Sequence, residues 1–136
     1  MRHQLAEVGV ELRLDGRASR QVSMNRTELQ QVIVNLIANA CNALPAGGTI
    51  TINASDADRD GVSGICLRFS DTGTGIAEET LARIFDPFFT TRGARGGTGL
   101  GLSICRTLID RQGDSIEAES RLGEGATFTI WLPEAV

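Results

Sequence analysis

The stretch from residue 26 to residue 44 constrains the fold of this chain more than any other part of the sequence. Its apolar residues recur at every third or fourth position, so they fall on one continuous face of a helix: Leu29, Val32, Ile33, Leu36, Ile37, Ala40 and Leu44. Asn25 or Thr27 can cap the start of this helix, and Pro45 with Gly47 ends the pattern. The spacing therefore predicts a helix over residues 26–44 that must bury one face against a second layer.

The second layer is predicted by segments in which apolar and polar residues alternate. Such segments span 8–16, 48–57, 61–70, 114–121 and 125–133. The first is expected to end in a turn at Asp15-Gly16, and the last two form a hairpin. Two shorter helices are expected over 77–85 and 101–113. The fold class is therefore α/β (α+β): a two-layer sandwich with a mixed, largely antiparallel sheet of about five strands, covered on one face by about three helices.

Composition excludes several classes of protein. The chain has 136 residues, 41% hydrophobic and 22% charged, which suits one globular domain over residues 1–136. A net charge of −4 argues against a nucleic-acid surface. No apolar run approaches the roughly 20 residues of a membrane span, so we expect no direct membrane insertion. Because the chain starts almost directly on a strand pattern, we expect a fragment of a longer protein.

The predicted helix 26–44 also carries a stripe of neutral amides. Gln31, Asn35, Asn39 and Asn42 are spaced by four, four and three residues, which places them on a second face. A solvated polar face is one interpretation, but such faces favour Glu, Lys and Arg, and this helix has no charged residue after Glu28. The stripe therefore favours a site that uses hydrogen bonding or metal coordination. An amide oxygen is a hard ligand that suits Mg²⁺.

Three glycine clusters follow the helix. In "DTGTGI", Asp71 can accept a hydrogen bond from an amino group while Gly73 and Gly75 let the backbone approach a flat ligand. In "GGTGLGLS", backbone N–H groups of residues 99–102 open a helix and form an anion site, without the spacing of a Walker P-loop or a dinucleotide fingerprint. In "GEGATF", the glycines suit a hairpin turn and Thr127 can add a polar contact. The long loop over residues 86–101 is expected to be functional.

Taken in order, these motifs resemble the catalytic, ATP-binding domain of sensor histidine kinases. That domain belongs to the GHKL ATPase superfamily (Bergerat fold), shared with Hsp90, gyrase B and MutL. The resemblance covers about residues 8–132, and "DPFFTTR" resembles the nitrogen-regulation and oxygen-sensing branch. It implies a cytoplasmic protein-histidine kinase domain of a two-component system, with ATP and Mg²⁺ as cofactors and a role in signal transduction by phosphorelay.

The resemblance also implies roles for individual residues. Asn39 matches the Mg²⁺-coordinating asparagine, and Asn35 matches the other asparagine of the same motif, so both are candidate catalytic residues. Asp71 matches the carboxylate that holds the adenine amino group. Phe85 belongs to the aromatic motif that anchors an ATP lid over residues 86–101, together with Phe88 and Phe89. The implied nucleotide-binding set is Asn39, Asn42, Asp71, Gly73, Gly75, Ile76, Thr91, Arg92, Gly97, Gly99, Leu100, Gly101, Leu102 and Thr127.

One position favours a kinase over a hydrolase. Hydrolysing members of the superfamily resemble one another in carrying a glutamate four residues before the Mg²⁺ asparagine, where it acts as general base. Here that position is Asn35, which cannot accept a proton, whereas neutral imidazole already offers a lone pair. The sequence thus favours transfer of the γ-phosphate to a histidine.

His3, the only histidine, lacks the helical setting of an acceptor. The expected partners are therefore a separate dimerisation and phosphoacceptor domain and a downstream response regulator, with no nucleic acid. The alternatives are a GHKL-type ATPase and a degenerate, nucleotide-free interaction module.

Overall fold

The computed structural model describes residues 9–22, 24–44, 47–86, 101–111 and 115–134. Five strands form one sheet in the order β1-β2-β3-β5-β4. Only β1 and β2 pair in parallel, while the other neighbours are antiparallel. The predicted mixed, largely antiparallel sheet is therefore confirmed. The strands span β1 Val10–Arg17, β2 Gly48–Arg59, β3 Val62–Asp71, β4 Ser115–Ser120 and β5 Ala126–Pro133.

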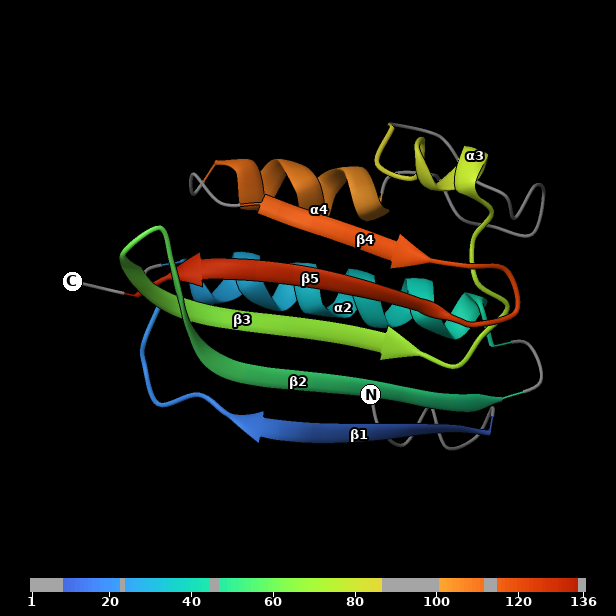
Figure 1. The fold of residues 1–136 in the computed structure, drawn as a ribbon, viewed down its shortest axis with the longest axis horizontal. Coiled ribbons are helices and arrows are strands. Elements are labelled where there is room, and N and C mark those ends of the chain that lie inside the picture. The colour runs from blue at the N-terminus through green and yellow to red at the C-terminus, as the bar shows by residue number, and fades with distance from the viewer. Residues whose placement is uncertain (1–8, 23, 45–46, 87–100, 112–114, 135–136) are drawn as a thin grey trace.

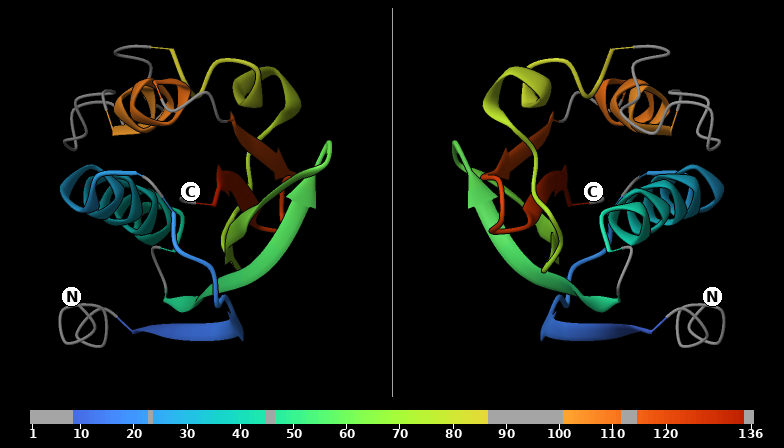
Figure 2. Two further views of the ribbon diagram at one scale, coloured as in Figure 1. Left: turned by 90° about the vertical axis from the view of Figure 1, so that its left-hand side faces the viewer. Right: turned by 90° about the vertical axis from the view of Figure 1, so that its right-hand side faces the viewer.

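In the described part of the chain three helices cover one face of this sheet, as predicted. Figure 2 shows α2 and α4 on the same side of the strands, with α3 near the end of β4. The helices span α2 Arg26–Asn42, α3 Glu78–Leu81 and α4 Gly101–Asp110. All three are shorter than the sequence pattern predicts. Leu44 is buried beyond the end of α2.

The core lies between the sheet and the helices and is largely aliphatic. Strand β5 alternates strictly, with Ala126, Phe128, Ile130 and Leu132 buried on the face toward the helices. Helix α2 buries Val32, Leu36, Ile37 and Ala40 against that face. Figure 1 shows α2 behind the central strands, running along them.

Helix α2 begins where the sequence predicts because of a local cap. The side-chain oxygen of Asn25 accepts hydrogen bonds from the backbone N–H groups of Thr27 (2.8 Å) and Glu28 (3.2 Å). These bonds satisfy donors that an isolated helix start leaves unpaired. Asn25, and not Thr27, is therefore the capping residue.

The predicted turn at Asp15-Gly16 is wrong. Strand β1 continues through both residues to Arg17, and Gly16 pairs with Ala54 of β2. Gly16 has φ +83°, and a side chain there would overlap the carbonyl oxygen of Ala54. Glycine at this position therefore allows the two strand backbones to approach closely, and it does not form a turn.

Among the described residues, no helix is both long enough and apolar enough to cross a bilayer.

Candidate functional site

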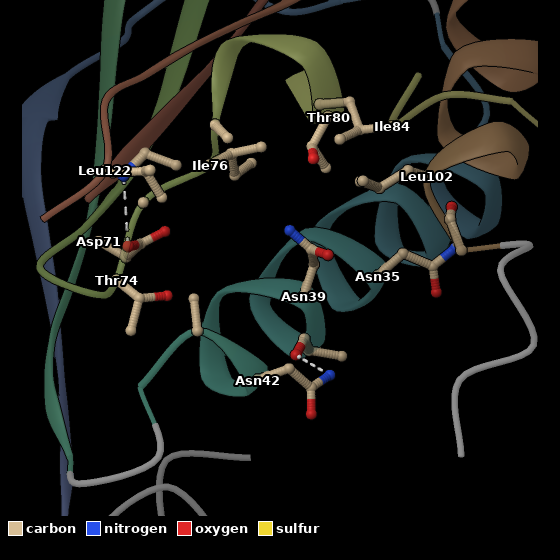
Figure 3. Close-up of a pocket in the computed structure, with 16 residues that line it drawn as sticks. Asn35, Asn39, Asn42, Asp71, Thr74, Ile76, Thr80, Ile84, Leu102 and Leu122 are labelled. Atoms are coloured by element: carbon tan, nitrogen blue, oxygen red, sulfur yellow. Dashed lines mark hydrogen bonds between the residues drawn. The ribbon is translucent and has the colours of Figure 1, made fainter. Parts of the chain in front are cut away.

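A cavity of about 400 Å³ opens between α2, the glycine-rich segment after β3 and the start of α4. Figure 3 shows its lining side chains, with Asp71 at one end and the asparagines of α2 along one wall. Eight of the predicted site residues line it: Asn35, Asn39, Asn42, Asp71, Gly75, Ile76, Gly101 and Leu102. The fold therefore brings the asparagines of α2, the segment after Asp71 and the start of α4 together around one cavity.

The asparagines of α2 differ in what their amides do. Asn35 accepts a hydrogen bond from Gln31 (2.8 Å) and donates one to the carbonyl oxygen of Gly101 (3.3 Å). Asn42 donates to the carbonyl oxygen of Ala38 in its own helix (2.9 Å). The amide of Asn39 has no partner among the described residues, and Figure 3 shows it pointing into the cavity. Asn39 is thus the asparagine free to meet a ligand.

Asp71, the last residue of β3, is a buried acid with 8% of its surface exposed. Its Oδ1 accepts hydrogen bonds from the backbone N–H groups of Gly73 (2.9 Å) and Ala126 (3.3 Å). Burial raises the pKa of this carboxyl above its usual 3.8, although the two hydrogen bonds act to lower it. Figure 3 shows the carboxylate facing the cavity. Asp71 therefore offers a fixed acceptor to a ligand that carries a donor.

The two glycines after Asp71 are required by close backbone packing. A side chain at Gly73 would overlap the carbonyl oxygen of Ala43, at the end of α2. Gly75 has φ +75°, and a side chain there would overlap the carbonyl oxygen of Arg121. Gly75 lines the cavity, whereas Gly73 lies beside Asp71 and supports its carboxylate.

Thr127 does not line the cavity, although the resemblance places it in the nucleotide-binding set. It lies on the sheet face away from the helices, where its hydroxyl is 3.2 Å from that of Ser70. Its neighbour Ala126 lines the cavity instead. Because successive strand residues point to opposite faces, the side chain of Thr127 does not line this cavity.

The remaining predicted residues Thr91, Arg92, Gly97, Gly99 and Leu100 lie outside the described residues, as do Phe88, Phe89 and nearly all of the expected lid. Phe85 is described. It packs edge-on against Phe128 with ring centroids 6.2 Å apart, and the guanidinium of Arg106 lies 5.6 Å from its ring centre.

Several lining residues were missed by sequence reasoning. They are small or apolar side chains, most of them in the segments that connect helices and strands: Ala38, Ala43, Thr74, Ala77, Thr80, Ile84, Leu122 and Ala126. Ala38 could have been found, because it lies three residues after Asn35 on the same helical face. Leu122 and Ile84 could not, because only the folded chain brings their segments to the asparagines.

The sheet, its single helical layer and the cavity between Asn39 and Asp71 define a domain of the ATP-binding class. The chain belongs to the family described as histidine kinase-, DNA gyrase B- and HSP90-like ATPases, which it matches over residues 24–136.

Relatives and solved structures point to one branch of that family. The sensor kinase CckA of Brucella abortus is 40% identical over 139 residues, which cover 93% of this chain and 15% of CckA. The catalytic domain of histidine kinase ThkA superposes with a TM-score of 0.82 at 33% identity, covering 97% of this chain and 85% of that domain. Full-length ShkA in complex with AMPPNP superposes with a TM-score of 0.81 at 29% identity, covering 100% of this chain and 28% of ShkA.

A further ThkA structure contains its response regulator protein TrrA, and matches with a TM-score of 0.77 at 30% identity, covering 98% of this chain and 36% of that chain. The first curated relatives are much longer than this chain, which spans 15% to 23% of their length.

Proposed function

We propose that this chain is the catalytic domain of a sensor histidine kinase, which binds Mg²⁺-ATP in the cavity and donates the γ-phosphate to a histidine on a separate dimerisation domain. A response regulator then receives the phosphate, and the reaction takes place in the cytoplasm. The similarity to sensor kinases, to AMPPNP-bound ShkA and to ThkA with its regulator supports this assignment. AMPPNP is an analogue of ATP, so the ligand class is the same.

The end of the cavity at Asp71 suits the adenine base. A carboxylate accepts hydrogen bonds and cannot donate them, so it favours a ligand that presents an amino group. One carboxylate oxygen is already held by two backbone N–H groups. The side chain cannot turn away without losing these bonds, so the acceptor is pre-organised for the base.

The opposite end suits the phosphates. Asn39 offers a free amide oxygen as a hard ligand for Mg²⁺. Gly101 and Leu102 line the cavity in the first turn of α4, where backbone N–H groups have no acceptor within the helix. A bound Mg²⁺ would supply charge neutralisation on the phosphate oxygens. Asn39 and Asn42 would then orient the phosphate chain without adding negative charge.

The observation that carries the kinase assignment is the lack of a second acid. Asp71 is the only carboxylate among the described lining residues, and it lies at the base end. At the position of a general base stands Asn35, whose amide is held by Gln31 and Gly101. Water needs a base to become a good nucleophile, whereas a neutral imidazole nitrogen does not. In the proposed step, that nitrogen forms a bond to the γ-phosphorus as the bond to the bridging oxygen breaks, and ADP leaves with the electron pair.

Calorimetric titration with AMPPNP, with and without Mg²⁺, tests the binding part of this proposal. We expect saturable binding to the wild-type chain, at least about tenfold weaker binding to Asp71→Asn because a charge-assisted bond is lost, and loss of the Mg²⁺ effect in Asn39→Ala. Asn53→Ala, on the other face of the sheet, is the matched control and should bind as the wild type does. Equal affinity of Asp71→Asn and wild type would refute the assigned base site.

Transfer is tested by adding a purified dimerisation domain that carries an acceptor histidine, with γ-labelled ATP. We expect label on that domain that is lost in acid and retained in base, as for a phosphorus–nitrogen bond. Rapid release of free phosphate without labelling would instead support a simple ATPase.

A further inference from the structure

We propose that Leu122 is a base-contacting residue, which covers one face of the flat ring whose amino group Asp71 binds. Leu122 lies in the turn between β4 and β5. The inference rests on the proposed function and extends it to the recognition of the base.

The exposure of Leu122 is the first observation. In the described part of the chain it is the most exposed large hydrophobic residue, at 69%. Leu14 on the edge strand β1 is nearly as exposed, at 60%, but does not line the cavity, whereas Leu122 does. An apolar side chain at the rim of a binding cavity gains free energy when a ligand covers it.

The backbone around Leu122 is held rigidly against the segment that carries Asp71. The N–H group of Gly123 donates to the carbonyl oxygen of Thr74 over 2.7 Å. Side chains at Gly75 and Gly125 would overlap the carbonyl oxygens of Arg121 and Asp71 respectively, so these backbones are in direct contact. The turn cannot move away without breaking this packing. Leu122 is therefore fixed at the Asp71 end of the cavity.

The surroundings of Leu122 specify the ligand surface that fits there. Figure 3 shows Leu122 and Ile76 beside the carboxylate of Asp71, with Asn39 on the opposite wall. Ala126, which also lines the cavity, adds a further apolar contact. A ligand at this end must bring a hydrogen-bond donor in its plane for Asp71 and an apolar face for Leu122. An aromatic amine such as a nucleobase has both.

The test compares Leu122→Ala with Leu14→Ala and Leu122→Met in calorimetric titrations of the whole chain. ADP, adenosine and Mg²⁺-tripolyphosphate are the probes. We expect Leu122→Ala to bind ADP and adenosine about fivefold more weakly, since part of the apolar contact is lost, and tripolyphosphate unchanged. Leu122→Met keeps the contact area and should stay within about twofold of wild type. Leu14→Ala removes a leucine that is nearly as exposed but lies outside the cavity, and it should leave the affinity for all three probes unchanged.

The outcomes separate this inference from the function on which it rests. If the wild-type chain binds ADP in an Asp71-dependent manner and Leu122→Ala binds as tightly, Leu122 does not contact the base and only the present inference fails. Equal losses for tripolyphosphate and adenosine would also overturn it, because the effect would then not come from the base. If the wild type binds no nucleotide, both proposals fall. Thermal unfolding of each variant verifies that the fold is intact.

Discussion

The side-chain amide of Asn35 donates a hydrogen bond to the carbonyl oxygen of Gly101, 3.3 Å away, and so joins helix α2 to the first residue of helix α4. The two residues are far apart in sequence, and the bond is partly buried. Gln31 holds the amide in orientation from one turn earlier. Asn35 is therefore best described as a positioning residue at the edge of the cavity.

Replacing Asn35 with alanine should lower the free energy of unfolding by about 1 kcal/mol, because one partly buried hydrogen bond between helices is lost. Asn42→Ala is the matched control. It makes the same substitution in the same helix, at the last residue of α2, and removes only a bond to Ala38 within α2. Because Asn→Ala gains less helix propensity at a helix end than in the interior, the control does not exaggerate the loss at Asn35. Urea unfolding at neutral pH measures both. Equal stabilities of the two variants would show that the Asn35–Gly101 bond contributes nothing.

The raised pKa of Asp71 predicts a pH dependence of stability. Burial disfavours the ionised form in the folded state, so the folded pKa lies above the usual 3.8. A group with a raised folded pKa contributes stability that is fully present below the unfolded pKa and is lost as the pH rises through the folded one. The wild type should thus gain stability relative to Asp71→Asn as the pH falls toward 3.8. Paired denaturant unfolding curves across this range check the sign, and a constant difference would contradict it.

Two glycines of the β4–β5 turn predict different tolerances to a side chain. Gly123 and Gly125 both have positive φ, +80° and +78°, so alanine at either costs about 1–2 kcal/mol. A side chain at Gly123 meets no atom within 4 Å, whereas one at Gly125 overlaps the carbonyl oxygen of Asp71. Gly125→Ala should therefore have a free energy of unfolding about 1–3 kcal/mol lower than that of Gly123→Ala. Thermal unfolding of the pair measures the difference, and similar melting temperatures would mean that the Asp71 backbone yields easily.

The three cysteines should differ in reactivity. Cys105 is fully buried, its thiol lies 3.7 Å from the carbonyl oxygen of Val32, and burial raises its pKa to about 11. At pH 8 only about one thiol in a thousand would be ionised. Iodoacetamide should modify the half-buried Cys41 and Cys66 long before Cys105 in the native chain, and all three alike in urea. Peptide mapping by mass spectrometry reads the order. Early labelling of Cys105 would indicate that α4 opens readily.

Much of the fold follows from periodicity. The apolar spacing on α2 predicts its buried face correctly, since Val32, Leu36 and Ile37 lie at 0% to 4% exposure. Strand alternation likewise predicts the buried side of β5. The parallel pairing of β1 with β2 was not predictable in this way, because no local pattern reports which strands meet across the chain.

The candidate site was predictable where one element carries it. Asn35, Asn39 and Asn42 share a helical face, and their spacing alone places them together. Thr127 and Leu122 show where prediction of site residues from the sequence fails. A shift of one residue on β5 moves a side chain to the other face of the sheet, so motif matching at this precision cannot separate Thr127 from Ala126. Leu122 reaches the cavity only through contacts between two turns.

Helix α2 serves the core and the cavity at once, and this dual use makes the chain intolerant of changes in length. Each residue added to a helix rotates everything after it by about 100°. A single insertion after Ile33 would turn Leu36, Ile37 and Ala40 out of the core, and would carry Asn39 and Asn42 away from the cavity with them. The same insertion at the tip of the β2–β3 hairpin, beside Gly61, would meet open solvent. Frame-preserving insertions and deletions should therefore be tolerated at that hairpin and eliminated throughout residues 26–42.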